Sequence, residues 1–169
     1  MKLSKWDTPF FNVEWLVCDH LVRINGEFTE ISVTEHHVIP PEPITEPIED
    51  PVERLIAESS PIVQTADSVN WRVRFENAIA MRIEPERYRH NKEWPRLDEP
   101  GNSFIFENSS WIDEFAEEFE DLEPGSRHYV LFTSHEFIEV ISRNPPEITD
   151  NHSNEVGFLA RLRKTLLRR

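Results

Sequence analysis

The sequence predicts an α+β domain made mainly of antiparallel sheet, with one amphipathic helix packed on the sheet and a second helix at the C-terminus. Three observations predict this class: apolar–polar alternation over residues 69–84, an apolar stripe at helical spacing over residues 111–122, and two short apolar runs separated by a turn within residues 128–142. The length of 169 residues suits one domain with its own core. We assign residues 1–150 to a single α+β domain and residues 151–169 to a basic C-terminal helix or tail.

The first predicted element is a hairpin near the N-terminus. Residues 11–17 alternate apolar and polar side chains, as a half-buried strand requires. Asn25-Gly26 follows, and this pair favours a type I′ turn because both positions need a positive φ. Pairing through this turn predicts one shared face for five side chains: Cys18, Val22, Ile24, Ile31 and Val33.

A proline-rich segment comes next. Five prolines fall within residues 40–51, and proline lacks the amide donor that a strand or a helix interior needs. We therefore expect an extended surface loop over residues 40–51. A short helix over residues 52–59 is expected to follow it and to end before Pro61.

The alternation in residues 69–84 is the clearest strand signal. Seven apolar side chains from Val69 to Ile83 share one parity, while arginine and glutamate dominate the other. Asn77 is the one polar residue on the apolar parity, so we expect a bend or bulge there that divides the segment into two strands. Residues 85–103 are polar and contain three prolines, which predicts a loop.

A short strand over residues 104–106 precedes the predicted helix 111–122. Ser110 suits the N-cap, and Asp113 stands three residues later, where a carboxylate resembles the second half of a capping box. Pro124-Gly125 ends the helix.

The C-terminal third continues with a predicted hairpin. Residues 128–133 and 137–142 read as two buried strands around a short turn. Residues 147–153 are polar, and we expect them to form no regular structure. From Asn154 onward, leucines at helical spacing predict the second amphipathic helix.

The charge of the chain is acidic and uneven. Its net charge is −14, which disfavours nucleic acid binding by the main body because a negative surface repels phosphates. Residues 155–169 carry five basic groups and one acid, a net of +4, which leaves −18 for the rest. We expect this tail to dock on its own acidic body. The alternatives are contact with a membrane or nucleic acid, and a homo-oligomer formed through the C-terminal helix.

Cysteine content and hydropathy bear on the compartment. The single cysteine excludes an intramolecular disulfide and a thiolate zinc cluster, and it fits a reducing environment. No apolar run approaches the ~18 residues that span a bilayer, and no signal-peptide pattern follows Met1. We therefore expect a cytoplasmic protein without a transmembrane segment.

The sequence contains no recognisable catalytic signature. It has no glycine-rich dinucleotide or Walker loop, no nucleophile elbow and no ligand-spaced histidine pair, so we assign no catalytic residue, no cofactor and no metal. Cys18 fits a small buried strand residue better than a nucleophile. The alternative function is a small enzyme with a site built from dispersed residues, for which His128, His135 and Glu139 are the candidates.

The function we expect is a non-catalytic protein-interaction module. Residues 107–123 contain eight acids and no base. Such a face is ordinarily solvated, and the alternative is that it meets a basic partner. The loop 85–103 adds aromatic and arginine side chains, which are common interface anchors. The candidate partner-binding residues are Glu114, Glu117, Glu118, Asp121, Trp94, Arg96 and Tyr88.

One stretch resembles a known kind of protein. The pattern of Trp111 to Phe119, followed by His128-Tyr129-Val130-Leu131-Phe132 and Phe137-Ile138-Glu139-Val140-Ile141, is similar to the helix-then-hairpin of small acidic uncharacterised bacterial proteins. Some of those are assigned as immunity proteins that neutralise toxins. The similarity covers roughly a third of the chain. It implies an inhibitor-type role against a basic partner surface and transfers no site residue.

Overall fold

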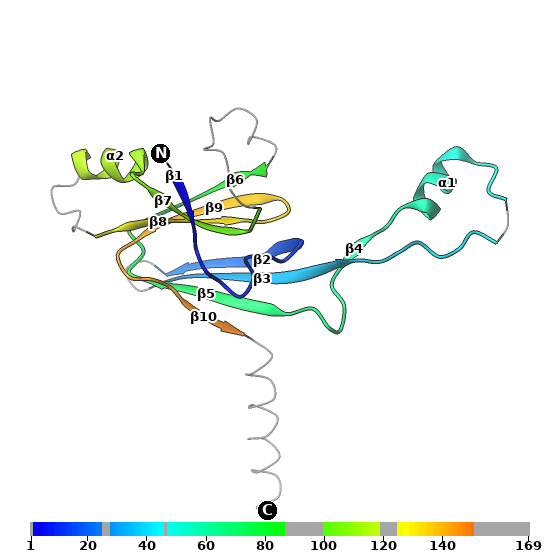
Figure 1. Ribbon diagram of the computed structural model, residues 1–169, viewed down its shortest axis with the longest axis horizontal. Helices are drawn as coiled ribbons and strands as arrows, with labels where there is room; N and C mark the ends of the chain where they lie inside the picture. The colour runs from blue at the N-terminus through cyan, green and yellow to red at the C-terminus, as the bar shows by residue number, and fades with distance from the viewer. Residues whose placement is uncertain (1, 25–27, 46, 87–99, 119–124, 151–169) are drawn as a thin grey trace, which may run out of the picture.

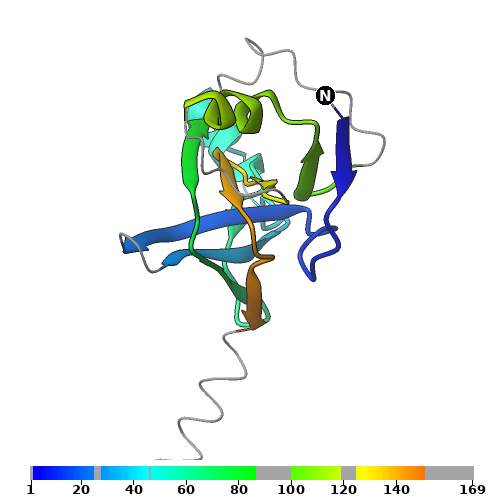
Figure 2. The same cartoon turned by 90° about the vertical axis from the view of Figure 1, so that its left-hand side faces the viewer.

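Two antiparallel sheets stacked face to face form the body of the protein (Figures 1 and 2). The structure is a computed structural model that describes residues 2–24, 28–45, 47–86, 100–118 and 125–150. A helix, α2, covers part of the outer face of the first sheet. The predicted α+β class with mainly antiparallel sheet and one packed helix is therefore confirmed, while the expected C-terminal helix lies outside the described residues.

The first sheet lies next to α2. Its strand order is β1-β7-β8-β9-β6, and every neighbouring pair is antiparallel. The predicted hairpin of residues 128–142 is confirmed as β8 and β9, and the predicted short strand 104–106 is confirmed as β7. The elements of this layer are β1 Lys2–Lys5, β6 Ala80–Pro85, β7 Ser103–Glu107, α2 Ser110–Glu118, β8 Arg127–Phe132 and β9 Glu136–Ser142.

The second sheet has the order β10-β5-β3-β2, and a short strand, β4, pairs with the C-terminal end of β3. Its outer face carries polar pairs such as Arg72 and Glu30, whose Nε and Oε1 atoms lie 3.2 Å apart. The strands are β2 Trp15–Ile24, β3 Phe28–Val38, β4 Ile62–Val63, β5 Asn70–Glu76 and β10 Glu147–Asp150.

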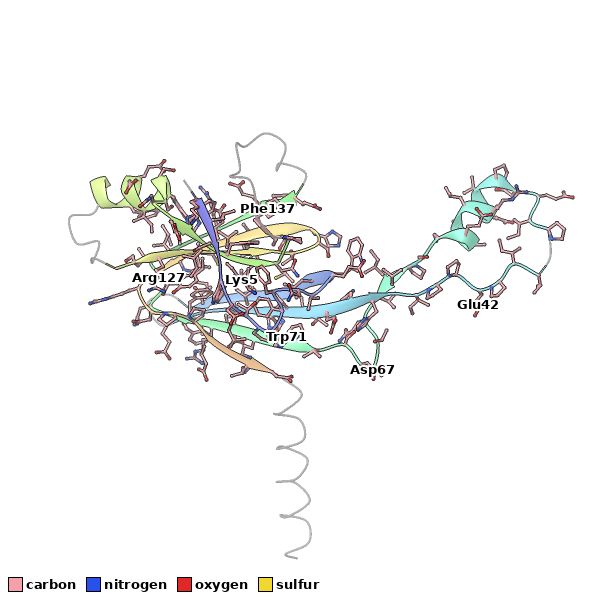
Figure 3. All side chains as sticks on the ribbon, viewed as in Figure 1. Lys5, Glu42, Asp67, Trp71, Arg127 and Phe137 are labelled. Carbon is pink, nitrogen blue, oxygen red and sulfur yellow. The ribbon has the colours of Figure 1, made fainter. Side chains whose placement is uncertain are left out.

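Aromatic side chains fill the space between the sheets. Trp71, Val73 and Phe75 of β5 are buried, which confirms the apolar parity predicted for this strand. Tyr129 of β8 meets Phe75 from the opposite sheet, with ring centroids 5.3 Å apart. Figure 3 shows the side chains crowded around Trp71 in the body and spread thinly along the segment that carries Glu42.

Asn77 bends the chain between the two sheets. Its φ of 57° lies in the left-handed region that asparagine tolerates, so β5 ends in the second sheet and β6 begins in the first. The predicted bend is therefore confirmed. Ile79, just before β6, and Ile83, on the edge strand β6, remain 36% and 42% exposed, however, so the predicted apolar parity does not continue into a buried face there.

The N-terminal region departs from the predicted strand. Residues 8–13 form turns in place of a strand, and the side-chain amide of Asn102 donates to the carbonyl oxygens of Phe10 and Val13. Phe10 points into the core between the sheets, whereas Phe11 joins a second cluster on the outer face of the first sheet. Adjacent apolar residues therefore pack into two different clusters. The sequence pattern of such a turn looks the same as that of a strand with two buried faces.

Two further predictions are corrected by strand pairing. A register shift between Cys18 and His20 places Val22 and Ile24 on the outer face of the second sheet, whereas Ile31 points into the core. Val22 and Ile24 are therefore 41% and 42% exposed. The turn Asn25-Gly26 itself lies outside the described residues. Residues 147–150 form strand β10 along β5, because their backbone pairs with the edge of β5 and Ile148 packs against the core between the sheets.

An arm projects from the second sheet (Figure 1). We call residues 39–61 the arm: it leaves β3, passes through the proline-rich segment, forms helix α1 over Pro51–Glu58 and returns to β4. Its base is closed by the amide of Ile39, which donates to the carbonyl of Pro61 at 3.0 Å. The short helix expected over residues 52–59 is observed over Pro51–Glu58, so it begins one residue earlier, within the segment expected to be a loop.

No helix within the described part of the chain is long and apolar enough to cross a membrane.

Candidate functional site

Helix α1 at the end of the arm is held by its own caps. Asp50 is the N-cap, and its Oδ1 accepts from the amides of Val52 and Glu53 at 2.7 and 3.1 Å. Pro51 follows at the first helical position, where its missing amide costs nothing. At the other end, Ser59 Oγ donates to the carbonyl of Ile56 at 2.6 Å. The caps of this helix are therefore supplied by residues of the arm itself.

The apolar face of α1 is open to solvent. Val52, Leu55 and Ile56 lie on one side at spacings of three and one, and they are 64%, 70% and 66% exposed. No residue of α1 is buried. Of the eleven large hydrophobic side chains exposed in the described chain, seven lie at residues 38–62. A contiguous exposed apolar surface of this kind is typical of a binding site.

The arm is also acidic. Residues 40–61 contain six acids and one arginine, a net charge of −5. The arginine, Arg54, donates from Nη2 to the carbonyl of Ile48 at 2.7 Å and so braces the turn before the helix. The arm therefore offers apolar side chains surrounded by carboxylates to whatever contacts it.

A second group of polar residues lies between α2 and the outer face of the first sheet. Glu139 of β9 is fully buried, and Arg82 of β6 donates to it twice, from Nε at 2.7 Å and from Nη2 at 2.6 Å. The Nε2 atom of His128 lies 2.9 Å from the same carboxylate. Ser109 Oγ lies 2.8 Å from the other ring nitrogen, Nδ1. We call these four residues the buried network.

Aromatic rings enclose the buried network. The guanidinium of Arg82 lies 4.4 Å from the ring centroid of Trp111, and the His128 ring lies between Trp111 and Phe106 at 5.1 and 4.6 Å. Burial raises the pKa of Glu139, but the contacts from His128 and Arg82 outweigh it and hold the pKa below its usual value. The carboxylate is thus kept charged, and the network ties α2, β6, β8 and β9 together.

The catalytic alternative required His128, His135 and Glu139 to converge on a pocket. The structure brings His128 and Glu139 together, yet they are 1% and 0% exposed, so neither reaches a substrate. His135 is exposed in the turn at the far end of the β8–β9 hairpin. A half-open cavity of about 330 Å³ at that end is lined by Glu14, Glu86 and other residues and includes none of the three candidates. This arrangement favours a structural role for the network.

Cys18 fits the structural interpretation made from the sequence. Burial, with smaller contributions from Glu136 and Asp19, raises the pKa of its thiol to about 11. A nucleophilic cysteine needs the opposite shift, because the thiolate is the reactive species. Within the described chain, no group of three histidine, cysteine or acidic side chains could hold a metal ion.

The candidate residues of the acidic helix are only partly placed. Glu114 is exposed on α2, and its charge acts on Arg82. Glu117 and Glu118 belong to the same helix, and their side chains lie outside the described part of the structure. Tyr88, Trp94, Arg96 and Asp121 lie outside the described residues. Their role in partner binding stays a prediction.

The N-cap of α2 differs from the expected one. Ser109 Oγ accepts from the amide of Ile112 at 3.4 Å, and its carbonyl accepts from Asp113 at 3.2 Å, so Ser109 and not Ser110 is the cap. Two adjacent serines are equivalent in a local pattern, and contact with His128 selects the first.

Removing this cap has a measurable consequence. We expect Ser109→Ala to lower the free energy of unfolding by about 1–2 kcal/mol, because it removes both the cap and the bond to buried His128. Ser110→Ala, on the exposed first turn, should change it by less than about 0.5 kcal/mol. Urea unfolding of both variants measures this, and equal losses would contradict the assignment.

No family model, no curated protein and no solved structure matches this chain. Its function is therefore argued from its own geometry.

Sequence reasoning overlooked the apolar face of α1. It correctly placed a helix over residues 52–59 but searched for partner contacts among the acids of residues 107–123. A signal was available: Val52, Leu55 and Ile56 share one helical face within a segment whose prolines separate it from the sheet pattern. Such a helix has no neighbouring element against which to bury that face.

Proposed function

We propose that the protein is a non-catalytic interaction module that inserts helix α1 into an apolar groove with a basic rim on a partner protein. The exposed face of Val52, Leu55 and Ile56 carries this proposal. An amphipathic helix that places side chains at these spacings into a groove is a recurrent mode of recognition. Because the arm carries a net charge of −5, we expect basic residues at the rim of the groove.

The free energy of burying the apolar face of α1 is too small for tight binding by this helix alone, so the partner must make additional contacts. Full burial of each of the three side chains contributes about 1.5–3 kcal/mol. Association costs about 4–15 kcal/mol in lost freedom of motion, so α1 alone gives weak binding. The acidic residues Glu114, Glu117, Glu118 and Asp121 and the loop residues Tyr88, Trp94 and Arg96 remain our candidates for a second contact with the same partner.

The acidic arm is compatible with an inhibitor of the toxin-immunity type. Such a protein neutralises a basic surface by covering it, and this requires charge and shape without catalytic groups. The single cysteine favours a reducing compartment, so we propose that binding takes place in the cytoplasm.

Replacing Leu55 with aspartate tests the proposal. In affinity purification from source-cell extract, we expect Leu55→Asp to lose the stoichiometric partner that the wild-type chain retains, with an affinity at least about tenfold lower once that partner is purified. Since Leu55 is 70% exposed, thermal unfolding should be unchanged within about 0.5 kcal/mol.

The matched control for this experiment is Ile24→Asp. Ile24 is also an exposed aliphatic residue, but it lies at the end of the second sheet opposite the arm. It should leave binding unchanged. Retention of the partner by Leu55→Asp at wild-type affinity, or equal loss in both variants, would refute binding through α1.

A further inference from the structure

We infer that the basic segment 155–169 of the same chain packs along α1 and covers its apolar face when no partner is bound. The segment carries a net charge of +4, and the arm carries −5. Both have aliphatic side chains at helical spacing: Leu159, Leu162 and Leu166 in the segment, and Val52, Leu55 and Ile56 in α1. Charge and apolar pattern are thus complementary.

Sheet topology directs the chain toward the arm before it enters this segment. β10 is antiparallel to β5, and β5 is antiparallel to β3, so β10 runs parallel to β3. Asp150 pairs with Trp71, which in turn pairs with Val33. The chain therefore leaves β10 pointing to the end of the second sheet from which the arm projects.

The length of the segment matches the distance to α1. From the level of Val33, five strand residues lead to Val38, and the three residues between α1 and β4 add four residue steps, about 30 Å in total. With the helix that the sequence predicts from Asn154 onward, three extended residues after Asp150 followed by sixteen helical residues give a reach of about 34 Å. On this sequence-based expectation, Leu166 falls within about one helical turn of Leu55.

The same chain is favoured over a second copy as the source of the segment. Helix α1 has only eight residues, and two short helices bury too little surface for the roughly 1,200 Å² of a stable interface between molecules. A tether removes this requirement because it holds the segment at millimolar effective concentration. Since α1 is also the proposed partner-binding helix, segment and partner compete for one face, and here we rely on the function proposed above.

Disulfide trapping in the full-length chain tests the inference. On a Cys18→Ser background, we expect Leu55→Cys with Leu166→Cys to oxidise to an internally crosslinked monomer, seen by intact mass and loss of free thiols. The control pair, Ile24→Cys with Leu166→Cys, places the first thiol at the opposite end of the sheet and should crosslink at least about tenfold more slowly. Similar rates for both pairs, or crosslinked dimers alone, would overturn the inference.

Charge reversal provides a second readout that does not depend on trapping geometry. Glu53→Lys with Glu58→Lys should slow crosslinking about fivefold, and adding Arg163→Glu with Arg168→Glu should restore it. The rate should also fall as salt rises, because these charges are exposed. An unchanged rate in the reversed chain would count against the pairing.

The two proposals fail in different ways. If trapping fails while Leu55→Asp still abolishes partner binding, only the inference about segment 155–169 is wrong. If trapping succeeds while Leu55→Asp binds the partner normally, α1 is covered by the segment but is not the partner site. If both hold, Arg163→Glu with Arg168→Glu should strengthen partner binding, because the competitor is weakened.

Discussion

Glu139→Gln is expected to cause the largest loss of stability among single polar substitutions in the described chain, about 3 kcal/mol at pH 7. The carboxylate is fully buried and accepts two hydrogen bonds from Arg82 while His128 lies 2.9 Å away. Removing one partner of a buried ion pair costs about 3–5 kcal/mol. The lower end applies because the side chain of Arg82 is 37% exposed and regains water.

The pH dependence of this loss follows from the pKa of Glu139. The pKa in the folded state lies below the ordinary value of 4.5, so the carboxylate stabilises the fold fully above about pH 4.5. That stabilisation is lost as the pH falls through the folded-state pKa. The difference between wild type and Glu139→Gln, measured by urea unfolding, should therefore be constant near neutral pH and shrink in acid.

Glu30→Gln is the matched control. Glu30 also pairs with an arginine across neighbouring strands, but on the open face of the second sheet. Its replacement should cost about 1 kcal/mol, less than that of Glu139, because Glu30 and Arg72 are 15% and 42% exposed and solvent screens their attraction. Equal losses for the two glutamates, or a loss at Glu139 that grows in acid, would contradict the role assigned to the buried network.

Phe10→Ala is expected to lower the free energy of unfolding by about 3–5 kcal/mol. Phe10 lies in the turns between β1 and β2, yet it is fully buried between the sheets. Its ring packs against Trp6 and Trp71, with centroids 6.4 and 5.6 Å apart. Truncation leaves a cavity that rigid strands on both sides cannot close.

Phe28→Ala is the control for size and aromaticity. Phe28 lies on the outer face of the second sheet, partly exposed, under the guanidinium of Arg74 at 4.1 Å. Its loss should cost about 1 kcal/mol. The free energies of unfolding of both variants are compared by chemical denaturation. A small loss for Phe10→Ala would show that the turn segment does not contribute to the core.

The periodicity of apolar residues was sufficient to predict a strand or helix wherever each of its faces meets one kind of surroundings along its whole length. Trp71, Val73 and Phe75 alternate with polar residues, and the structure buries them as expected. The hairpin of β8 and β9 was equally predictable from the sequence. Nearly every side chain in it is buried, so both strands stand out as apolar runs. The caps of α1 are also local, since Asp50 and Pro51 act within one turn of the helix.

Periodicity failed where distant residues set the environment. Phe11 and Val13 looked like the start of a strand because they alternate with polar residues, but the side chain of Asn102 holds their segment in turns. The register shift after Cys18 reversed the faces of Val22 and Ile24, because a single extra residue inverts a period of two. Strand β10 had little apolar signal, since Ile148 is its one apolar residue, and its pairing with β5 depends on the distant backbone of that strand.

The sequence by itself determined that residues 70–76 form a strand with one apolar face, that the chain bends at Asn77, and that a short helix follows the prolines. These features depend on neighbours within a few residues. Only the tertiary structure decided that Arg82, His128 and Glu139 meet in one buried network and that α1 extends away from the body with Leu55 in solvent. Burial and isolation are properties of the whole packed chain, because they depend on which distant elements come to cover a residue and which do not.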